Sequence, residues 1–121
     1  MTFRFAEIVG RYRLQISSAL LAFIEQRFVE PAPPSQREQV RSEALAEARA
    51  AELVIEADGT LISRAGAQEF YRVRLGDTGG ELSELSFDKA AGQSVRLLFS
   101  PPDTVTAFQT DKPQVTFTRF T

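Results

Sequence analysis

Residues 51–64 read Ala51-Glu-Leu-Val-Ile-Glu-Ala-Asp-Gly-Thr-Leu-Ile-Ser-Arg64. In this stretch, Asp58-Gly59 lies between two apolar runs, Leu53-Val-Ile-Glu56 and Leu61-Ile-Ser-Arg64. An Asp-Gly pair between apolar runs is a strong signal for a β-hairpin, because Gly accepts the positive φ that a tight turn requires. The sequence therefore predicts two antiparallel strands joined at Asp58-Gly59.

The β pattern continues from this hairpin to the end of the chain. Alternating apolar residues predict strands over residues 70–75, 82–87, 95–99, 105–109 and 115–120, with turns at 76–80, 90–92, 101–103 and 111–113. In the first of these strands, alternation places Phe70 on the face of Arg72 and Arg74, opposite Tyr71. Seven strands linked by short turns form an up-and-down meander.

One more strand and two helices are predicted before the hairpin. Residues 8–15 alternate as a strand does, and residues 17–28 carry an apolar stripe at helical spacing formed by Leu20, Leu21, Ile24 and Phe28. Prolines at 31–34 end this helix, and Ser35-Gln-Arg-Glu38 has the form of a capping box at the start of a second, over residues 36–51. The second helix presents mostly methyl groups, from Val40, Ala44, Ala48 and Ala51, and should therefore pack closely against another element.

An open meander leaves two strand edges free to pair with other chains, and pairing of the first strand with the last removes both. We therefore predict a mainly β fold with an α insertion in a single domain, residues 1–121. It is an antiparallel up-and-down barrel of about eight strands, with a helix pair at about residues 17–51 inserted between strands 1 and 2 and lying across the open end. A barrel of this size is either filled by side chains or leaves room for one small ligand.

Composition excludes several classes of function. The 121 residues include no Cys and no His, so the residues of Cys-His and Ser-His-Asp catalytic sites, of the usual zinc sites and of His-ligated haem are missing. The 14 basic and 16 acidic residues are evenly spread, which argues against nucleic-acid binding. Arginine outnumbers lysine 12 to 2, a bias from which we predict no function. We expect no cofactor, no metal site and no catalytic residues.

The sequence pattern predicts neither a secretory signal nor a membrane-spanning segment. The N-terminus lacks the apolar core of a secretory signal, and the longest apolar run, residues 19–24, is far too short to span a membrane. We therefore expect a cytoplasmic protein.

The order of these elements resembles the calycin superfamily, in particular small bacterial lipocalin-like and fatty-acid-binding-protein-like domains. The resemblance rests on Gly10, Tyr12 and Leu14 in the first strand, on Asp58-Gly59 and on Arg119. Those families open with a Gly-x-Trp/Tyr strand, and the fatty-acid binders insert a helix pair before the second strand. The resemblance implies a barrel that holds a small hydrophobic or amphipathic ligand.

Arg119 lies on the Val115/Phe117 face of the last strand. If this face points inward, the Arg119 guanidinium lies inside the barrel, where a buried charge needs an anion, an aromatic ring or water as its partner. The resemblance implies two roles. In fatty-acid binders a terminal Arg-x-Tyr clamps a ligand carboxylate, although here Thr121 replaces the Tyr. In lipocalins a late Arg stacks on the ring of the opening strand, here Tyr12, and closes the barrel floor. The stacked arrangement is preferred because it requires no departure from the motif.

Further candidate ligand contacts are Tyr71 and the phenylalanines of the strands, which suit either a ligand cavity or an ordinary core. The predicted ligand-binding residues are Arg119, Tyr12, Tyr71, Phe99 and Phe117, with Phe70, Phe87 and Phe108 as further cavity-lining candidates. Glu43 and Glu47 lie one helical turn apart beside several arginines, a pattern typical of a solvated helix face.

Three functions remain open at this stage. The first is a non-catalytic carrier that binds a small hydrophobic or amphipathic ligand inside the barrel. The second is an interaction module or homodimer with a filled barrel, which the methyl-lined second helix favours. The third is an isomerase or cyclase that uses Tyr12, Tyr71 or glutamates as acid/base groups, although no spacing singles out a reaction.

Overall fold

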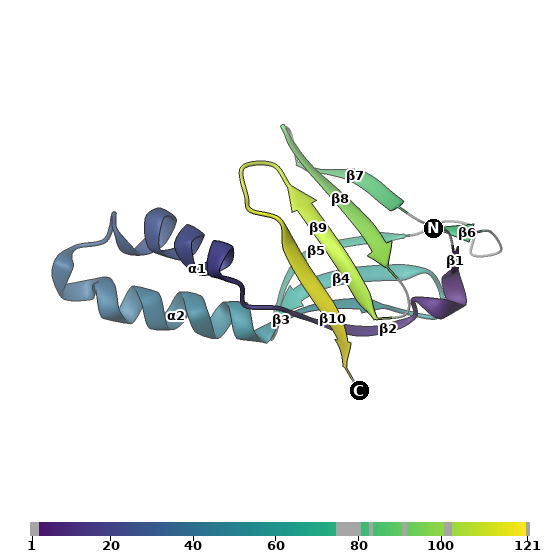
Figure 1. Cartoon of the computed structure of the whole chain (residues 1–121), viewed down its shortest axis with the longest axis horizontal. Coiled ribbons are helices and arrows are strands. Elements are labelled where there is room, and N and C mark those ends of the chain that lie inside the picture. Colours follow the sequence, from purple (N-terminus) through teal and green to yellow (C-terminus); the bar gives the residue numbers. More distant parts are fainter. Residues whose placement is uncertain (1–2, 75–80, 83, 91, 101–102, 121) are drawn as a thin grey trace.

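A computed structural model of the chain describes residues 3–74, 81–82, 84–90, 92–100 and 103–120. Its main sheet has eight strands: β2 (Gly10–Leu14), β3 (Ala51–Ile55), β4 (Thr60–Ala65), β5 (Gln68–Arg74), β7 (Glu84–Ala90), β8 (Gln93–Ser100), β9 (Thr104–Gln109) and β10 (Val115–Phe120). Two further strands, β1 (Phe3–Arg4) and β6 (Glu81–Leu82), pair with each other at the end of the barrel away from the helices (Figure 1). A short 3₁₀ turn, η1 (Phe5–Glu7), follows β1.

The eight strands form a nearly closed antiparallel barrel in the order β5-β4-β3-β2-β10-β9-β8-β7. As predicted, the first strand of this sheet lies beside the last, with Tyr12 of β2 opposite Arg119 of β10. The two edge strands, β5 and β7, approach each other through their side chains, since the rings of Tyr71 and Phe87 are 5.1 Å apart in an edge-to-face contact. Side-chain packing thus links the edges of the sheet.

The Asp58-Gly59 hairpin forms where the sequence predicts it, between β3 and β4. Gly59 has a φ of +96°, a conformation that favours glycine, and the Asp58 carboxylate accepts a hydrogen bond from the Thr60 amide at 2.9 Å. The predicted turn at 76–80 lies outside the described residues, as do Ala91 and the prolines at 101–102.

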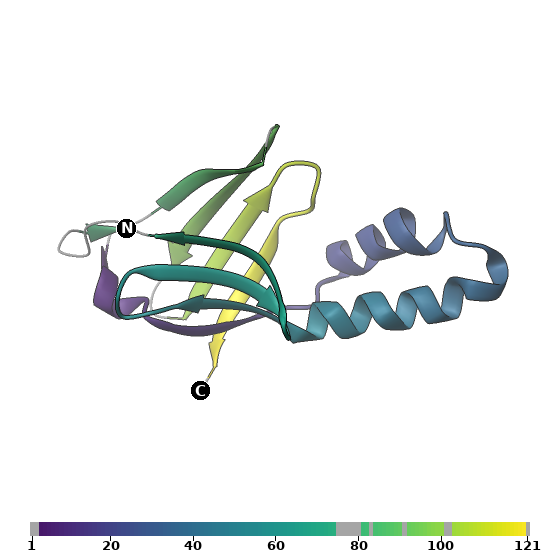
Figure 2. The same ribbon diagram turned by 180° about the vertical axis from the view of Figure 1, so that it is seen from behind.

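The two predicted helices form a hairpin between β2 and β3. The first is α1 (Ser18–Ile24), continued by a π-helical segment η2 (Glu25–Val29); a 3₁₀ turn η3 (Pro34–Gln36) precedes α2 (Arg37–Ala50). Within the described ranges, no helix is both long and apolar enough to cross a membrane. The hairpin extends outward from one end of the barrel, and its base packs on β2 and β4 (Figures 1 and 2). The helices were predicted to lie across the open end of the barrel, and only the base of the hairpin does so.

The capping box predicted at Ser35 is wrong. Gln36 occupies the cap position of α2 and makes no side-chain cap bond, because Ser35 lies inside the preceding 3₁₀ turn. Arg37 instead donates hydrogen bonds back to the carbonyls of Ala32 and Glu30, each at 3.2 Å. A serine does form a cap at the other helix, where Ser17 accepts from the Leu20 amide at 3.2 Å.

Candidate functional site: a pocket at the helical end of the barrel

Buried apolar side chains fill the barrel interior except at its helical end, where two of them, Tyr71 and Phe117, also line the pocket described below. Its buried core is formed by Ile8, Tyr12, Leu53, Ile55, Leu61, Tyr71, Val95, Leu97, Phe99, Val105, Ala107 and Phe117. Leu53, Leu61 and Leu97 have no exposed surface. At the opposite, filled end the interior follows the close packing of an ordinary protein core.

Arg119 and Tyr12 close this filled end. The guanidinium lies over the Tyr12 ring, 5.2 Å from its centroid, and donates hydrogen bonds to the Tyr12 hydroxyl at 2.7 Å and to the Glu7 carbonyl. The Tyr12 hydroxyl in turn donates to the Ile8 carbonyl at 2.6 Å. Burial raises the pKa of Tyr12, although the Arg119 charge acts in the opposite direction. These contacts match the arrangement in which Arg119 stacks on the ring of Tyr12.

Gly10 lies against the Arg119 side chain, and its backbone conformation favours glycine. A Cβ at this position would lie 3.6 Å from Arg119 Nε, and the φ of +152° is one that L side chains rarely adopt. The Arg119 Nε is buried and donates no hydrogen bond to any described residue; the Asp103 carboxylate is 3.9 Å away. The glycine of the opening motif is thus favoured by its backbone conformation, since a Cβ there would make only an ordinary contact with the arginine stem.

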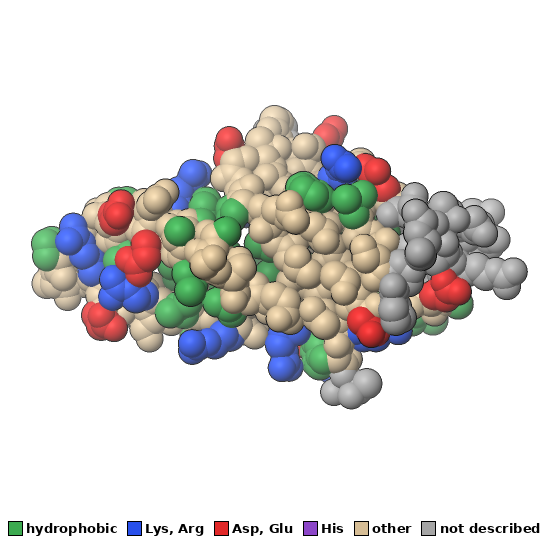
Figure 3. Space-filling view, in the orientation of Figure 1, with side chains coloured by type: hydrophobic (Ala, Val, Ile, Leu, Met, Phe, Trp, Pro, Cys, Tyr) green, Lys and Arg blue, Asp and Glu red, His purple; other side chains and the backbone are tan. Residues whose placement is uncertain are grey.

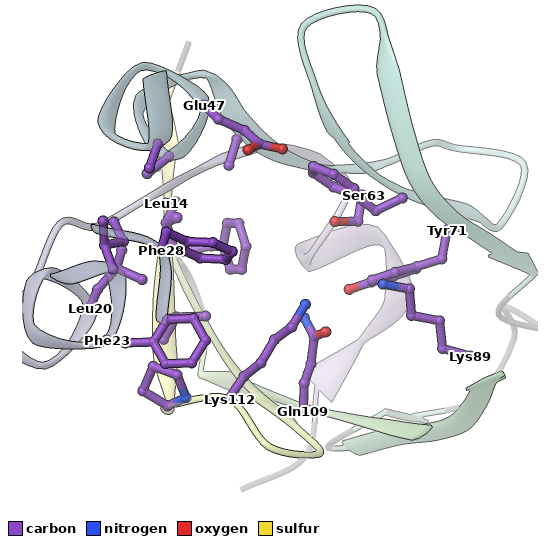
Figure 4. Close-up of a pocket in the computed structure, with 18 residues that line it drawn as sticks. Leu14, Leu20, Phe23, Phe28, Glu47, Ser63, Tyr71, Lys89, Gln109 and Lys112 are labelled. Atoms are coloured by element: carbon purple, nitrogen blue, oxygen red, sulfur yellow. The ribbon is translucent and has the colours of Figure 1, made fainter. Parts of the chain in front are cut away.

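A pocket of about 260 Å³ occupies the other end, between the barrel interior and the base of the helical hairpin. Its apolar wall is formed by Leu14, Leu20, Phe23, Ile24, Phe28, Ala44, Ala48, Ala51, Phe70, Pro113, Val115 and Phe117. Polar groups are contributed by Glu47, Ser63, Tyr71, Lys89, Gln109 and Lys112 (Figure 4). In the space-filling view, hydrophobic side chains gather at the junction between hairpin and barrel (Figure 3). The barrel is therefore filled at one end and hollow at the other.

The helical wall of the pocket depends on the change from α-helix to π-helix after Ile24. A π turn bonds residue i to residue i+5, as in the bond from the Glu30 amide to the Glu25 carbonyl at 2.8 Å. The wider turn places Phe28 beside Phe23, with ring centroids 6.0 Å apart. Both rings line the pocket, and Phe28 is also 49% exposed; Leu21, which the predicted stripe included, is 41% exposed and does not line the pocket.

The hairpin is held together by a second apolar cluster and by Arg41. Leu20, Ile24, Val29 and Ala48 are its buried members, with the predicted methyl face of α2 packed alongside. Arg41 of α2 forms an ion pair with Glu25 of η2, which lowers the pKa of Glu25. Leu14 and Val115 pack against both this cluster and the barrel core, so the hairpin is continuous with the barrel.

The barrel wall of the pocket contains a β-bulge that the sequence pattern did not predict. Ser63 is opposite Tyr71 and Arg64 is opposite Glu69, so Phe70 is the extra residue. As a result Phe70 and Tyr71 both line the pocket, and the placement of Phe70 on the face of the outward arginines is wrong. Burial raises the pKa of Tyr71 to about 12, and the hydroxyl of buried Ser63 acts in the opposite direction. The Tyr71 phenol is therefore neutral at physiological pH.

Both lysines of the chain line this pocket. The Lys89 ammonium of β7 is 5.9 Å from the centroid of the Tyr71 ring, and Lys112 projects inward from the turn between β9 and β10 (Figure 4). The pKa of Lys112 is lowered, first by burial and then by the charges of Lys89 and Arg27, with Glu47 acting in the opposite direction. The scarcity of lysine in the sequence could have drawn attention to these two residues. Composition alone could not show that they lie in the same pocket.

The predicted site residues divide between the two ends. Tyr71 and Phe117 line the pocket, whereas Tyr12, Phe99 and Arg119 belong to the filled end and do not line it. Phe87 contacts Tyr71, but Phe108 faces outward beneath the Arg96 guanidinium, 5.2 Å from its ring centroid. Glu47, expected on a solvated helix face, borders the pocket. The residues that sequence reasoning missed are mainly those of the hairpin and the two lysines.

Metal-binding side chains do not cluster in the described part of the chain, where no group of three or more Asp or Glu residues could hold an ion. Comparisons of the chain with protein-family models, with curated proteins and with solved structures found no match. The arguments about function therefore rest on the geometry of the pocket.

Proposed function

We propose that this protein is a non-catalytic binding protein that holds one small amphipathic molecule in the pocket between the helical hairpin and the barrel. The single observation that carries the proposal is the 260 Å³ space itself, lined mainly by apolar side chains and a few convergent polar groups. Small-molecule sites in proteins have this character. The nearly closed barrel, with its first strand beside its last and a helix pair in between, is compatible with the calycin-like fold that the sequence resembles.

In this proposal, the filled end of the barrel is a rigid base and the pocket supplies the affinity. Phe117 and Phe70 would contact the apolar part of the ligand, and burial of that part would stabilise the complex by roughly 25 cal/mol for each Å² removed from water. Tyr71, a neutral hydroxyl at the pocket wall, would orient a polar group. Arg119, Tyr12 and Phe99 would act indirectly, by fixing the barrel on which the pocket is built.

Filling the pocket tests this proposal. We expect Ala44→Phe to weaken binding of the neutral dye Nile red by at least about tenfold, because the added ring occupies space that the ligand needs. The matched control is Ala46→Phe, on the same helix but exposed and outside the pocket lining. Dye fluorescence titrations of both variants give the comparison. Equal affinity in the two variants, or no dye binding by the unmodified protein, would contradict the proposal.

The exposed apolar side chains of the hairpin favour a second candidate, an interaction module that pairs with another copy of the chain. Ile16, Leu21 and Phe28 are 39%, 41% and 49% exposed. A second copy of the chain would cover such exposed apolar side chains. Light scattering separates the candidates: a dimer that Leu21→Glu converts to a monomer supports the second, and a concentration-independent monomer argues against it.

A further inference from the structure

The distribution of positive charge in the pocket identifies the chemistry of its ligand. The chain has 12 arginines and 2 lysines, and both lysines, 23 residues apart in sequence (112 − 89), line the same apolar pocket. Lysine carries a compact charge on a flexible stem, which suits contact with a single charged group. In the close-up, the two ammonium groups point into the pocket from the side opposite the Glu47 carboxylate (Figure 4).

The pocket has an excess of positive charge. Glu47 is the one carboxylate among its described lining residues, against the two lysines, and Arg27 on η2 adds a further positive charge near Lys112. Neither lysine forms an ion pair with any residue of the described ranges, whereas Arg11, Arg41, Arg64, Arg72 and Arg96 all do. Lys112 is exposed and Lys89 is half-buried with its ammonium near the Tyr71 ring, so both charges are available to an anion that enters the pocket.

We propose that Lys112 and Lys89 form an anion-recognition site at the pocket, so that the ligand is an apolar molecule ending in one negatively charged group such as a carboxylate. This inference rests on the proposed function and adds to it the position and the charge of the ligand's polar end. The apolar part of the ligand lies against Phe117 and Phe70, and the charged end lies between the two ammonium groups. The negative group therefore binds at the helical end of the barrel. Because a strand rises about 3.3 Å per residue, this position near Val115 is about 13 Å along β10 from Arg119, which closes the other end.

Binding of an anion should be coupled to the protonation of Lys112. In the free protein its pKa is lowered from the ordinary value of 10.5 by burial, Lys89 and Arg27, and a bound anion would raise it again. Protein with neutral Lys112 must therefore take up a proton to bind the anion. Affinity for an anion should fall as pH rises through the Lys112 pKa toward 10.5, while affinity for a neutral analogue stays constant. Tyr71, with a pKa of about 12, remains neutral over this range.

The test compares decanoate, decanol and decylammonium as competitors of Nile red on the full chain. We expect decanoate to bind most tightly and decylammonium least. Lys112→Met and Lys89→Met should each weaken decanoate binding about tenfold and leave decanol binding unchanged. Glu47→Gln should strengthen decanoate binding several-fold, since it removes the opposing charge. Arg72→Met, which removes an exposed charge beside Tyr71 on the outer face, is the matched control and should change nothing.

Each outcome has a definite meaning. Loss of selectivity for decanoate in both lysine variants, with dye binding retained, supports the anion site and also shows that the variants are folded. Equal binding of decanoate and decanol by the unmodified protein overturns the anion site while the proposed pocket stands. Weaker decanoate binding in Arg119→Ala, with no effect of the lysine variants, overturns it in favour of the opposite end. Failure of the dye itself to bind overturns the proposed function.

Discussion

Replacement of Arg119 by alanine is expected to lower the free energy of unfolding by about 2–4 kcal/mol, the combined effect of a cation–π contact and charged hydrogen bonds at a partly buried site. The variant loses the stacking on Tyr12, the hydrogen bond to its hydroxyl and the bond to the Glu7 carbonyl. Because Arg119 joins β10 to the segment before β2, its loss also loosens the contact that closes the barrel. Denaturant unfolding measures the change.

Arg96→Ala is the matched control for this prediction. Arg96 also lies over an aromatic ring, that of Phe108, and also meets a carboxylate, with Nε 2.7 Å from Glu84. Its side chain is 52% exposed, so its removal should cost less than about 1 kcal/mol. Dye affinity of the folded Arg119→Ala protein should equal that of the unmodified protein. Equal unfolding free energies in the two arginine variants would refute the structural role of Arg119.

Replacement of Leu97 by alanine is expected to cost about 2–5 kcal/mol, as for other leucines truncated in a packed core. Leu97 has no exposed surface, belongs to the buried core of the barrel and does not line the pocket, so its neighbours are too tightly packed to collapse around the missing atoms. Thermal and denaturant unfolding both report this loss. The prediction tests directly whether this core is closely packed.

Phe23→Ala provides the opposite case. Phe23 is half-buried and already borders the hollow end, so its removal enlarges an existing space and should cost no more than about 1–2 kcal/mol despite the larger side chain. Nile red affinity should change in this variant and remain unchanged in Leu97→Ala. A larger stability loss in Phe23→Ala than in Leu97→Ala would mean that the filled and hollow ends are assigned the wrong way round.

The features of the fold that the sequence predicts are those with a local or periodic cause. Asp58-Gly59 specifies its turn through the backbone freedom of glycine, and the alternation of Val115, Phe117 and Arg119 specifies which face of β10 points inward. Closure by pairing of the first and last strands follows because an open meander leaves edges exposed. These arguments need only neighbours in sequence or a general rule about sheets.

The features that escaped prediction arise where one residue is inserted or where distant segments meet. The bulge at Phe70 and the π turn after Ile24 each add one residue to a regular pattern and so change which side chains share a face. No residue type marks either position in the sequence. The pocket combines a helix face, a bulged strand and the turn carrying Lys112, elements that come together only in three dimensions. For the same reason the pattern of β10 could place Arg119 inside the barrel but could not show which end it closes.

The central claim, that the barrel is filled at one end and binds a ligand at the other, is tested most directly by an NMR titration of isotope-labelled protein with decanoate. We predict that the amide signals of Ala48, Ser63, Gln109 and Phe117, at the pocket, shift progressively and saturate. The signals of Gly10, Tyr12, Phe99 and Arg119, at the filled end, should stay in place. Shifts concentrated at Tyr12 and Arg119, with the pocket signals unmoved, would contradict the account.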